Sequence, residues 1–261
     1  MEDMDFSAFV KNMKSLTNID LSQYKEAQMK RRLTTLRLKR GYPSFKAYFD
    51  ALKQSTELMD EFLDRMTINV SEFWRNPNRW NVLADVFLPS LLKENPRLNC
   101  WSAACSTGEE PYTLAMILSE LGALKQAKIT ASDLDNVVLN KAKEGLYLDR
   151  AIRDVPPDYL KKYFEKSGIM YKISEQLKSY IRYERMNLLY DSYGSNYDLI
   201  ICRNVMIYFT EEAKHEMYMK FSRALRPGGI LFVGSTEQIF NPGSYGFESA
   251  ETFFYRKVQS V

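Results

Sequence analysis

The sequence predicts an α/β protein with a mainly parallel sheet, preceded by a small all-helical domain. From residue 3 to about residue 68, apolar residues recur every three or four positions, which is typical of amphipathic helices. From about residue 98, short apolar runs alternate with amphipathic stretches, the pattern of strand–helix units. A chain of 261 residues with 45% hydrophobic side chains can bury one large core and one smaller core.

Residues 1–80 are expected to form the helical domain together with its linker to the sheet domain. Asp20 precedes one helix of this region, and Gly41 followed by Pro43 ends it. Ser44 then begins the next region.

Residues 81–261 are expected to form the sheet domain. Candidate strands lie at 98–104, 128–132, 181–186, 197–202, 229–234 and 251–257. Candidate helices lie at 110–121, 135–144, 156–164 and 210–225. Two strand-like pieces flank a polar link between residues 169 and 186, which predicts a small antiparallel β-subdomain around residues 167–186.

Composition argues against membrane, metal and histidine chemistry. No apolar run approaches the roughly 20 residues of a membrane span. The first residues, MEDMDFSAF, lack the order of a secretory signal, so we expect a cytoplasmic protein without membrane insertion. Cys100, Cys105 and Cys202 form no CxxC pair, and neither a metal site nor a disulfide is expected. The single histidine, His215, lies in a polar helical stretch and is expected to be solvated.

Positive charge is concentrated in residues 24–40, which carry seven basic side chains against one acidic side chain, although the net charge of the chain is only +3. Met29, Leu33 and Leu36 form one apolar stripe there, so the basic residues could simply solvate the rest of a helix. A local basic patch can equally attract an acidic partner. Composition alone leaves both interpretations open.

The first motif with chemical meaning is WSAACSTGEEPYTLA, residues 101–115, where a strand runs through a small-residue turn into a helix. Such a turn lets backbone amides approach a ligand, although it is also an ordinary strand–helix connection. It holds only Gly108 where dinucleotide folds have three glycines. Glu109 and Glu110 at the helix start would repel a pyrophosphate, so a cationic ligand suits the turn better.

Two further motifs follow later strands. Asp133 ends the next strand, where an acidic residue can bind both hydroxyls of a ribose or simply cap the following helix. The apolar strand in residues 197–209 delivers Arg203, Asn204 and Tyr208 at its carboxyl end, the edge at which ligands bind in open α/β sheets. The sequence therefore predicts a nucleoside site without phosphates.

The linker INVSEFWRN, residues 68–76, contains Arg75. A guanidinium can hold a carboxylate through two parallel hydrogen bonds, and it can equally form a surface ion pair. Chemistry alone slightly favours the ion pair.

These motifs match a known family. NVSEFWR, WSAACSTGEEPY, SDLD, NLL, CRNVMIYF, LRPGGILFVGSTE and TFFY occur in this order. Together they resemble the chemotaxis receptor methyltransferases of the CheR family, especially those of Bacillus-like bacteria, over essentially the whole chain. The resemblance implies a class I S-adenosylmethionine methyltransferase (Rossmann-like) fold with a seven-stranded sheet. It also implies a protein-glutamate O-methyltransferase that uses S-adenosylmethionine, releases S-adenosylhomocysteine and forms glutamate methyl esters on membrane chemotaxis receptors for sensory adaptation.

The resemblance also implies the site residues. Arg75 and Tyr208 would be catalytic, with Arg75 orienting the substrate carboxylate and Tyr208 near the methyl group. Glu110 would neutralise the methionine amino group, and Asp133 would bind the ribose hydroxyls. The full set of implied cofactor-binding residues is Asn69, Ser71, Arg75, Glu110, Asp133, Asn187 and Leu188 beside the adenine, and Arg203 and Asn204 at the methionyl end.

The implied partner is the acidic methylation region of a receptor coiled coil. It would meet the basic residues Lys30, Arg31, Arg32, Arg37, Lys39 and Arg40. Two departures from the family pattern matter. Ser71 stands where many relatives have threonine, and residues 167–180 lack the glycine-rich link of relatives that bind a receptor's C-terminal pentapeptide. Tethering through such a peptide is therefore not expected.

Three other functions are weighed. A nucleic-acid methyltransferase fits the basic patch, but no interleaved basic–aromatic motif occurs, and residues 81–261 hold 22 basic and 22 acidic side chains, so no nucleic-acid partner is expected. A non-catalytic receptor-binding module is disfavoured because Glu110, Asp133, Arg75 and Tyr208 are all present. A nicotinamide oxidoreductase would need the missing glycines.

Overall fold

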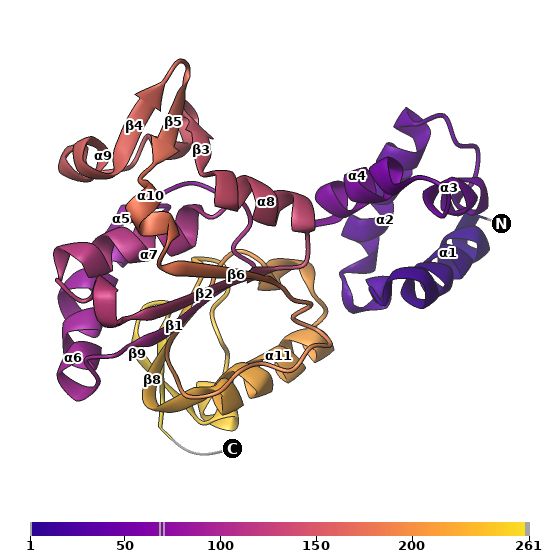
Figure 1. Ribbon diagram of the computed structural model, residues 1–261. Helices are drawn as coiled ribbons and strands as arrows, with labels where there is room; N and C mark the ends of the chain where they lie inside the picture. The colour runs from indigo at the N-terminus through magenta and orange to yellow at the C-terminus, as the bar shows by residue number, and fades with distance from the viewer. Residues whose placement is uncertain (1, 68, 70, 259–261) are drawn as a thin grey trace. The chain divides into compact units, whose positions relative to one another are not determined.

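The computed structural model describes residues 2–67, 69 and 71–258, and the chain divides into two compact units (Figure 1). The first unit comprises Met1–Asn69 and Met206–Glu216, and the second comprises Val70–Val205 and Met217–Val261. The first unit thus ends at Asn69, within the linker that was expected to belong with the helical domain in residues 1–80. It also contains a short segment from far along the chain, which no local pattern indicates.

The first unit is built from helices α1 (Glu2–Thr17), α2 (Glu26–Lys39), α3 (Phe45–Leu52) and α4 (Thr56–Thr67), with a 3₁₀ turn η1 at Leu21–Gln23. Aromatic side chains form its core, and Phe9 packs against the rings of Phe45, Tyr48 and Phe62. Ser44 accepts a hydrogen bond from the amide of Ala47 and so caps α3.

The segment Met206–Glu216 joins this unit through backbone pairing. The amide of Lys25 donates to the carbonyl of Tyr208 at 2.9 Å, and the amide of Thr210 donates to the carbonyl of Gln23 at 2.9 Å. The rings of Tyr24 and Phe209 lie 4.8 Å apart between their centroids. Tyr208 is therefore held against the start of α2.

The second unit contains a seven-stranded sheet in the order β6-β2-β1-β7-β8-β10-β9 (Figure 1). All its pairings are parallel except those of β10 with β8 and with β9. The strands are β1 (Asn99–Ala103), β2 (Lys128–Asp133), β6 (Ile181–Arg185), β7 (Tyr197–Cys202), β8 (Leu225–Val233), β9 (Phe247–Glu251) and β10 (Phe254–Lys257). β7 is buried along its whole length, as expected of a central parallel strand.

Helices follow or flank these strands. They are α5 (Pro77–Val82), the π-helical turn η2 (Leu83–Phe87), α6 (Leu88–Glu94), α7 (Glu109–Glu120), α8 (Asn136–Glu144), α9 (Pro157–Tyr163), α10 (Glu175–Lys178) and α11 (Glu211–Ala224), with 3₁₀ turns η3 (Leu124–Gln126), η4 (Asp149–Ile152), η5 (Met206–Tyr208) and η6 (Pro242–Tyr245). α7 packs on β1, β2 and β6, and nine of its twelve residues are buried. Among the described residues, no helix is both long and apolar enough to cross a membrane.

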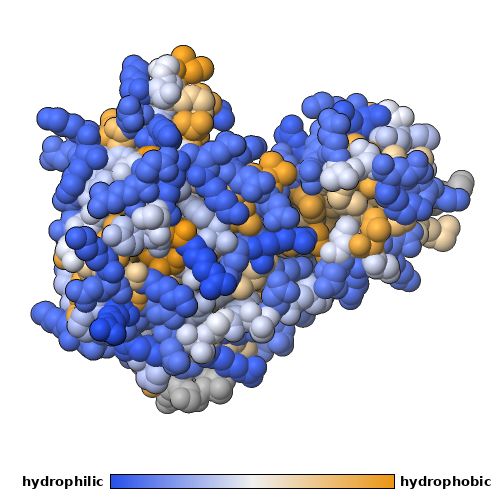
Figure 2. Space-filling view, viewed as in Figure 1, coloured by the Kyte–Doolittle hydropathy of each residue, from blue (hydrophilic) through white to orange (hydrophobic). Residues whose placement is uncertain are grey.

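A second, three-stranded antiparallel sheet stands apart from the main one, in the order β3-β5-β4 (Figure 1). Its strands are β3 (Leu146–Leu148), β4 (Phe164–Ser167) and β5 (Met170–Ile173). Ile169, in the turn between β4 and β5, is 81% exposed, and Figure 2 shows hydrophobic colour at the tip of this small sheet. The α/β class with a small antiparallel sheet and a helical domain is thus confirmed.

Several boundaries differ from the prediction, among them the start of β8 at Leu225 instead of residue 229. The small sheet lies at 146–173 and not around 167–186, because residues 181–185 pair in parallel with β2 in the main sheet. Residues 251–257 form a hairpin instead of one strand, since Phe253 takes a positive φ of 70° and reverses the chain between β9 and β10. Phenylalanine is an uncommon residue at such a turn, so the local sequence gives no signal for it.

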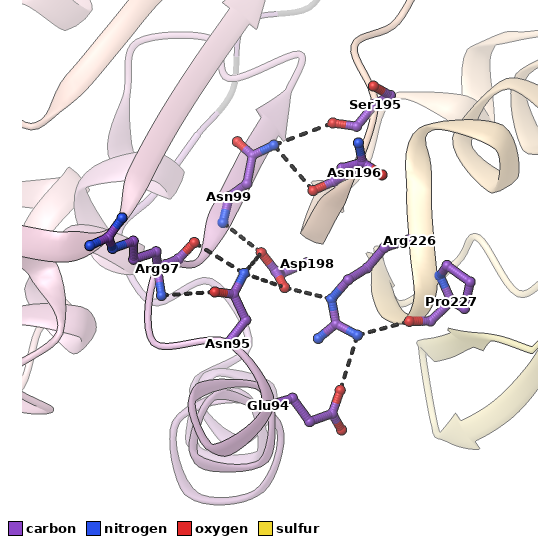
Figure 3. A network of polar contacts seen from close by, with 9 residues as sticks. All are labelled: Glu94, Asn95, Arg97, Asn99, Ser195, Asn196, Asp198, Arg226 and Pro227. Atoms are coloured by element: carbon purple, nitrogen blue, oxygen red, sulfur yellow. Dashed lines mark hydrogen bonds and ion pairs between the residues drawn. The ribbon is translucent and has the colours of Figure 1, made fainter.

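A polar network ties together the loop before β1, the start of β7 and the start of β8 (Figure 3). Its centre is the carboxylate of Asp198, which is 0% exposed. Asp198 accepts hydrogen bonds from the amide of Asn99 at 2.7 Å, from Asn95 Nδ2 at 3.0 Å and from Arg226 Nε at 2.6 Å. Arg226 also pairs with Glu94 at 3.0 Å. The amino ends of the central strands are therefore fixed by a fully paired charge.

Replacing Arg226 with alanine should destabilise the fold, because it removes the charged partner of a buried carboxylate. We expect Arg226→Ala to lower the free energy of unfolding by about 3 kcal/mol, measured by urea denaturation. The control is Arg153→Ala, since the Arg153 side chain is 70% exposed beside Asp154 and its loss should cost less than about 1 kcal/mol. Equal effects of the two substitutions would show that the network is dispensable.

Candidate active site

The loop between β1 and α7 lies at the carboxyl edge of the sheet and has an unusual backbone. Ala104, Ser106 and Gly108 have positive φ angles of 57°, 49° and 92°. A Cβ atom at Gly108 would come within 2.9 Å of the Cβ of Ala142, so no larger residue fits without a shift. Because positive φ angles occur at every second residue, the backbone groups of the loop point in different directions. The amide of Ser106 donates to Asp133 Oδ2 at 2.9 Å.

Glu110 lies in the first turn of α7, where the helix dipole favours a negative charge. Its Oε1 accepts a hydrogen bond from Ser102 Oγ at 2.7 Å, and its Oε2 lies 3.9 Å from the NH1 of Arg203. Burial raises the pKa of Glu110 to about 7, although the charge of Arg203 and the hydrogen bond from Ser102 oppose this shift. The carboxylate is therefore incompletely compensated by the protein.

Asp133 ends β2, beside the loop. It does not cap the next helix, since Asp135 does so by accepting a hydrogen bond from the amide of Val137. Asp133 instead accepts from the amides of Ser106 and Asp135. The backbone of Leu134 also hydrogen-bonds to this carboxylate. A carboxylate has roughly four lone-pair sites, so these three bonds do not use all of them. Burial raises the pKa of Asp133 to about 6 against the effect of the backbone hydrogen bonds from Asp135, Ser106 and Leu134.

Arg203 is the cation of this edge. Its side chain is 4% exposed and lies over the rings of Phe232 and Trp80, at 4.7 and 5.5 Å from their centroids. Its NH2 donates to the carbonyl of Arg75 at 2.7 Å and to Asn76 Oδ1 at 3.0 Å. Arg203 thus links the end of β7 to the segment that carries Arg75.

That segment is anchored by two buried aromatic residues. Phe73 packs edge-on against Tyr147, 4.7 Å between centroids, and Trp74 packs against Tyr159 at 4.8 Å. The half-buried Arg75 follows, and its charge acts on both Glu110 and Arg203. Ser71 forms a hydrogen bond with Glu109, whose pKa is raised by burial. The segment therefore brings Ser71 and Arg75 to the sheet edge, and their roles in cofactor binding stay predictions.

Asn187 and Leu188 follow β6, which is the neighbour of β2. The amide of Met186 donates to the carbonyl of Asp133, so this turn begins next to Asp133. Asn187 Oδ1 accepts from the amide of Leu189 at 3.1 Å and stabilises the turn. The two residues thus lie beside the predicted ribose-binding position.

Glu237 is a residue of this edge that sequence reasoning did not single out. Its buried Oε2 accepts from the amides of Asn204 and Gly234. The only sequence signal is its place in the motif LRPGGILFVGSTE after a buried strand.

Asn69 and Tyr208 belong to the first unit. Asn69 Nδ2 donates to Asp64 Oδ1 at 3.3 Å, and Tyr208 lies 5.6 Å from the guanidinium of Arg32, measured to the ring centroid. Their roles in the predicted site stay predictions.

The predicted receptor-binding residues differ in exposure. Arg31, Lys39 and Arg40 are exposed, and Arg40 pairs with Glu61 at 2.6 Å. Arg37 is only 6% exposed, because its guanidinium donates to the carbonyl of Tyr42 and lies over Phe45. The prediction that Arg37 belongs to a partner surface is therefore wrong, because its side chain stabilises the turn between α2 and α3. Arg32 donates to the carbonyl of Met66, and Lys30 lies over the ring of Phe6.

The sequence comparisons agree with this site. Residues 4–67 match the all-alpha domain of the CheR methyltransferases, and residues 69–254 match the CheR methyltransferase SAM binding domain. The chain belongs to the CheR methyltransferase family. This confirms the resemblance drawn from the motifs and identifies S-adenosylmethionine as the cofactor. The protein is an S-adenosylmethionine-dependent methyltransferase.

Relatives of the family extend over nearly the whole chain. A chemotaxis protein methyltransferase of Listeria monocytogenes is 43% identical over 257 residues and covers 98% of each chain. Chemotaxis protein methyltransferase 1 of Pseudomonas aeruginosa is 35% identical and covers 91% of each, and the Escherichia coli relative is 32% identical, covering 91% of this chain and 85% of its own. Among solved structures, the glycopeptide N-methyltransferase MtfA aligns at a TM-score of 0.38, with 12% identity over 63% of this chain and 50% of that one.

The residues present fit S-adenosylmethionine, which carries a positive sulfonium and an amino acid end but no phosphate. Glu110 and Asp133 supply two buried carboxylates whose raised pKa values reflect missing positive charge or hydrogen bonds. Ser106 Oγ, in the same loop, is buried and has no hydrogen-bond partner among the described residues. A ligand with hydroxyl groups and an ammonium group would satisfy all three.

Cofactor affinity should depend on pH. A bound cation favours the ionised carboxylates, so binding should release protons wherever Glu110 and Asp133 are partly protonated. With pKa values of about 7 and about 6, affinity should rise between about pH 5 and about pH 7.5 and then level off. Calorimetry in buffers of different ionisation heats measures the released protons. An affinity that stays constant over this range would contradict the assignment of both acids.

Proposed function

We propose that the protein transfers a methyl group from S-adenosylmethionine to glutamate side chains of membrane chemoreceptors, giving glutamate methyl esters. The observation that carries the proposal is a buried acidic edge matched to a cationic donor, next to an arginine, Arg75, with no histidine involved. The names of the relatives, which describe chemotaxis protein methyltransferases, support the same acceptor class.

The proposed acceptor explains why the site needs no general base. When bound, S-adenosylmethionine supplies an electrophilic methyl group on a positively charged sulfur. A glutamate side chain has an ordinary pKa near 4.3, so it is already an anionic nucleophile at neutral pH. The residues of the site therefore have to bind, align and exclude water, and alignment can contribute up to about 7–11 kcal/mol.

Arg75 is proposed to orient the acceptor carboxylate. Its backbone carbonyl is fixed by Arg203, and the aromatic anchors Phe73 and Trp74 precede it. A guanidinium that pairs with a carboxylate aligns it but also lowers its nucleophilicity, so we assign Arg75 orientation and not activation. Tyr208 is proposed to position the reacting groups.

The acceptor region is proposed to bind along α2. A groove of about 380 Å³ between α2 and α4 is lined by Arg31, Arg32, Lys39 and Arg65, together with Gln28, Thr35 and Leu36. Four positive charges around one hollow favour an acidic helix of a receptor coiled coil. Tethering through a receptor tail is not part of the proposal, since only Gly168 and Ile169 join β4 to β5 and no glycine-rich link is present.

The acceptor chemistry can be tested directly. The purified protein is incubated with cofactor labelled in its methyl group and with membranes that carry chemoreceptors. Carboxyl methyl esters release labelled methanol in mild base, whereas methyl groups on nitrogen survive. Alkali-stable label on protein, or label on nucleic acid, would refute the glutamate acceptor.

In the same assay Arg75→Ala should lower turnover about 100-fold, because a misaligned acceptor loses much of the benefit of proximity. Cofactor affinity measured by calorimetry should change far less. The control is Arg79→Ala. Arg79 lies in α5, the helix that follows this segment, and pairs with Glu251 of β9. It is not proposed to contact either substrate. Unchanged turnover in Arg75→Ala would remove Arg75 from the mechanism.

Charge reversal of the exposed groove residues should weaken receptor methylation. We expect Arg31→Glu with Lys39→Glu to reduce the rate at least about tenfold at low ionic strength and less at high salt, because screening already weakens the attraction there. The matched control reverses two exposed lysines, Lys46 in α3 and Lys53 directly after it. If both pairs have the same effect, the groove has no specific role.

A further inference from the structure

The carboxylate of Glu237 joins the ends of two strands of the sheet. The residue is 4% exposed and lies just beyond β8. Its Oε2 accepts hydrogen bonds from the amide of Gly234, directly after β8, at 2.8 Å, and from the amide of Asn204, after β7, at 2.6 Å. Hydrogen bonds to an ionised acceptor are roughly twice as strong as neutral ones, so this is a firm link.

The backbone around Glu237 is built for this close approach. A Cβ atom on Gly234 would lie 2.5 Å from Glu237 Oε2 and 2.8 Å from the amide nitrogen of Asn204. Neither distance is tolerable, so a side chain at position 234 would push the carboxylate away from both amides. The sequence places its glycine where the link requires one.

Asn204 takes a turn conformation that the link from Glu237 supports. Its φ of 61° lies in the left-handed region, which asparagine tolerates better than most residues other than glycine. The residue before it is Arg203, whose guanidinium reaches Glu110 at 3.9 Å and the carbonyl of Arg75 at 2.7 Å. The turn that Glu237 holds therefore decides where Arg203 points.

We propose that Glu237 is a positioning residue for cofactor binding, whose carboxylate fixes the Arg203–Asn204 turn so that Arg203 bridges Glu110 and the Arg75 backbone. The inference concerns the cofactor end of the site. It can therefore hold or fail independently of the identity of the methyl acceptor.

Glu237 can affect the site through its hydrogen bonds and through its negative charge, and different variants are needed to separate the two effects. The negative charge of Glu237 acts on Glu110 and on Arg203 in addition to its hydrogen bonds. Glu237→Gln keeps an oxygen acceptor at the same reach and removes the charge. Glu237→Asp keeps the charge but shortens the side chain by one methylene, and Glu237→Ala removes both properties.

Calorimetry with S-adenosylmethionine measures the three variants. Leaving two buried amides unpaired should weaken binding about tenfold or more in Glu237→Ala and Glu237→Asp, whereas Glu237→Gln should stay within about threefold of the native protein. The control is Glu248→Gln on β9, whose carboxylate is 57% exposed and should leave binding unchanged. Thermal unfolding of each variant shows whether it is folded.

A second readout distinguishes this role from plain fold stabilisation. The charged groups that act on Glu110 are Arg203, Glu237 and Arg75, and Ser102 donates a hydrogen bond to it. Removing the negative charge in Glu237→Gln should move the pH midpoint of cofactor binding to lower pH, since Glu110 then ionises more easily.

The proposal is overturned if Glu237→Asp binds the cofactor as tightly as the native protein, if Glu237→Gln binds no better than Glu237→Asp, or if the pH midpoint of Glu237→Gln does not move. If Glu237→Ala fails to fold, the comparison of Glu237→Gln with Glu237→Asp still tests the proposal.

Discussion

Buried negative charge at the carboxyl edge of the sheet constrains the rest of this structure. Glu110 and Asp133 are removed from water, which disfavours their ionised forms, and the raised pKa values of both residues reflect that cost. The protein offsets the cost only in part, through the backbone amides of Ser106 and Asp135 and through Arg203. A site kept in this state gains most from a ligand that brings its own positive charge and hydroxyl groups. S-adenosylmethionine has both.

At the opposite end of the same sheet, the buried carboxylate of Asp198 is paired directly with a cation. Asp198 is as deeply buried as any group of the active edge, yet it accepts hydrogen bonds from a backbone amide, from Asn95 and from Arg226. That network fixes the amino ends of the strands. The contrast separates a structural carboxylate from functional ones, since proteins tend to depart from full satisfaction where they bind or react.

Much of this organisation could be predicted from the sequence, because the signals were local. Central strands such as Tyr197–Cys202 are nearly all apolar and buried, Arg203 follows that strand directly, and Asp133 ends the strand Lys128–Asp133. The rest depended on long-range pairing. Residues 181–185 have the same pattern whether they extend the small sheet or the main one, and the helices within residues 77–94 were not foreseen. The link from Glu237 to Asn204 spans 33 positions, and the burial of Arg37 depends on Phe45 and Tyr42. Neither contact produces a periodic pattern in the sequence from which it could be predicted.

The central claim is that a positively charged sulfonium donor is held by Glu110 and Asp133. The most direct measurement is a crystal structure of the protein with S-adenosylhomocysteine, the product that keeps the amino and ribose groups. The account predicts the amino group within hydrogen-bond distance of the Glu110 carboxylate and the ribose hydroxyls within hydrogen-bond distance of Asp133. A ligand bound elsewhere, or bound at this edge with neither acid in contact, would contradict it.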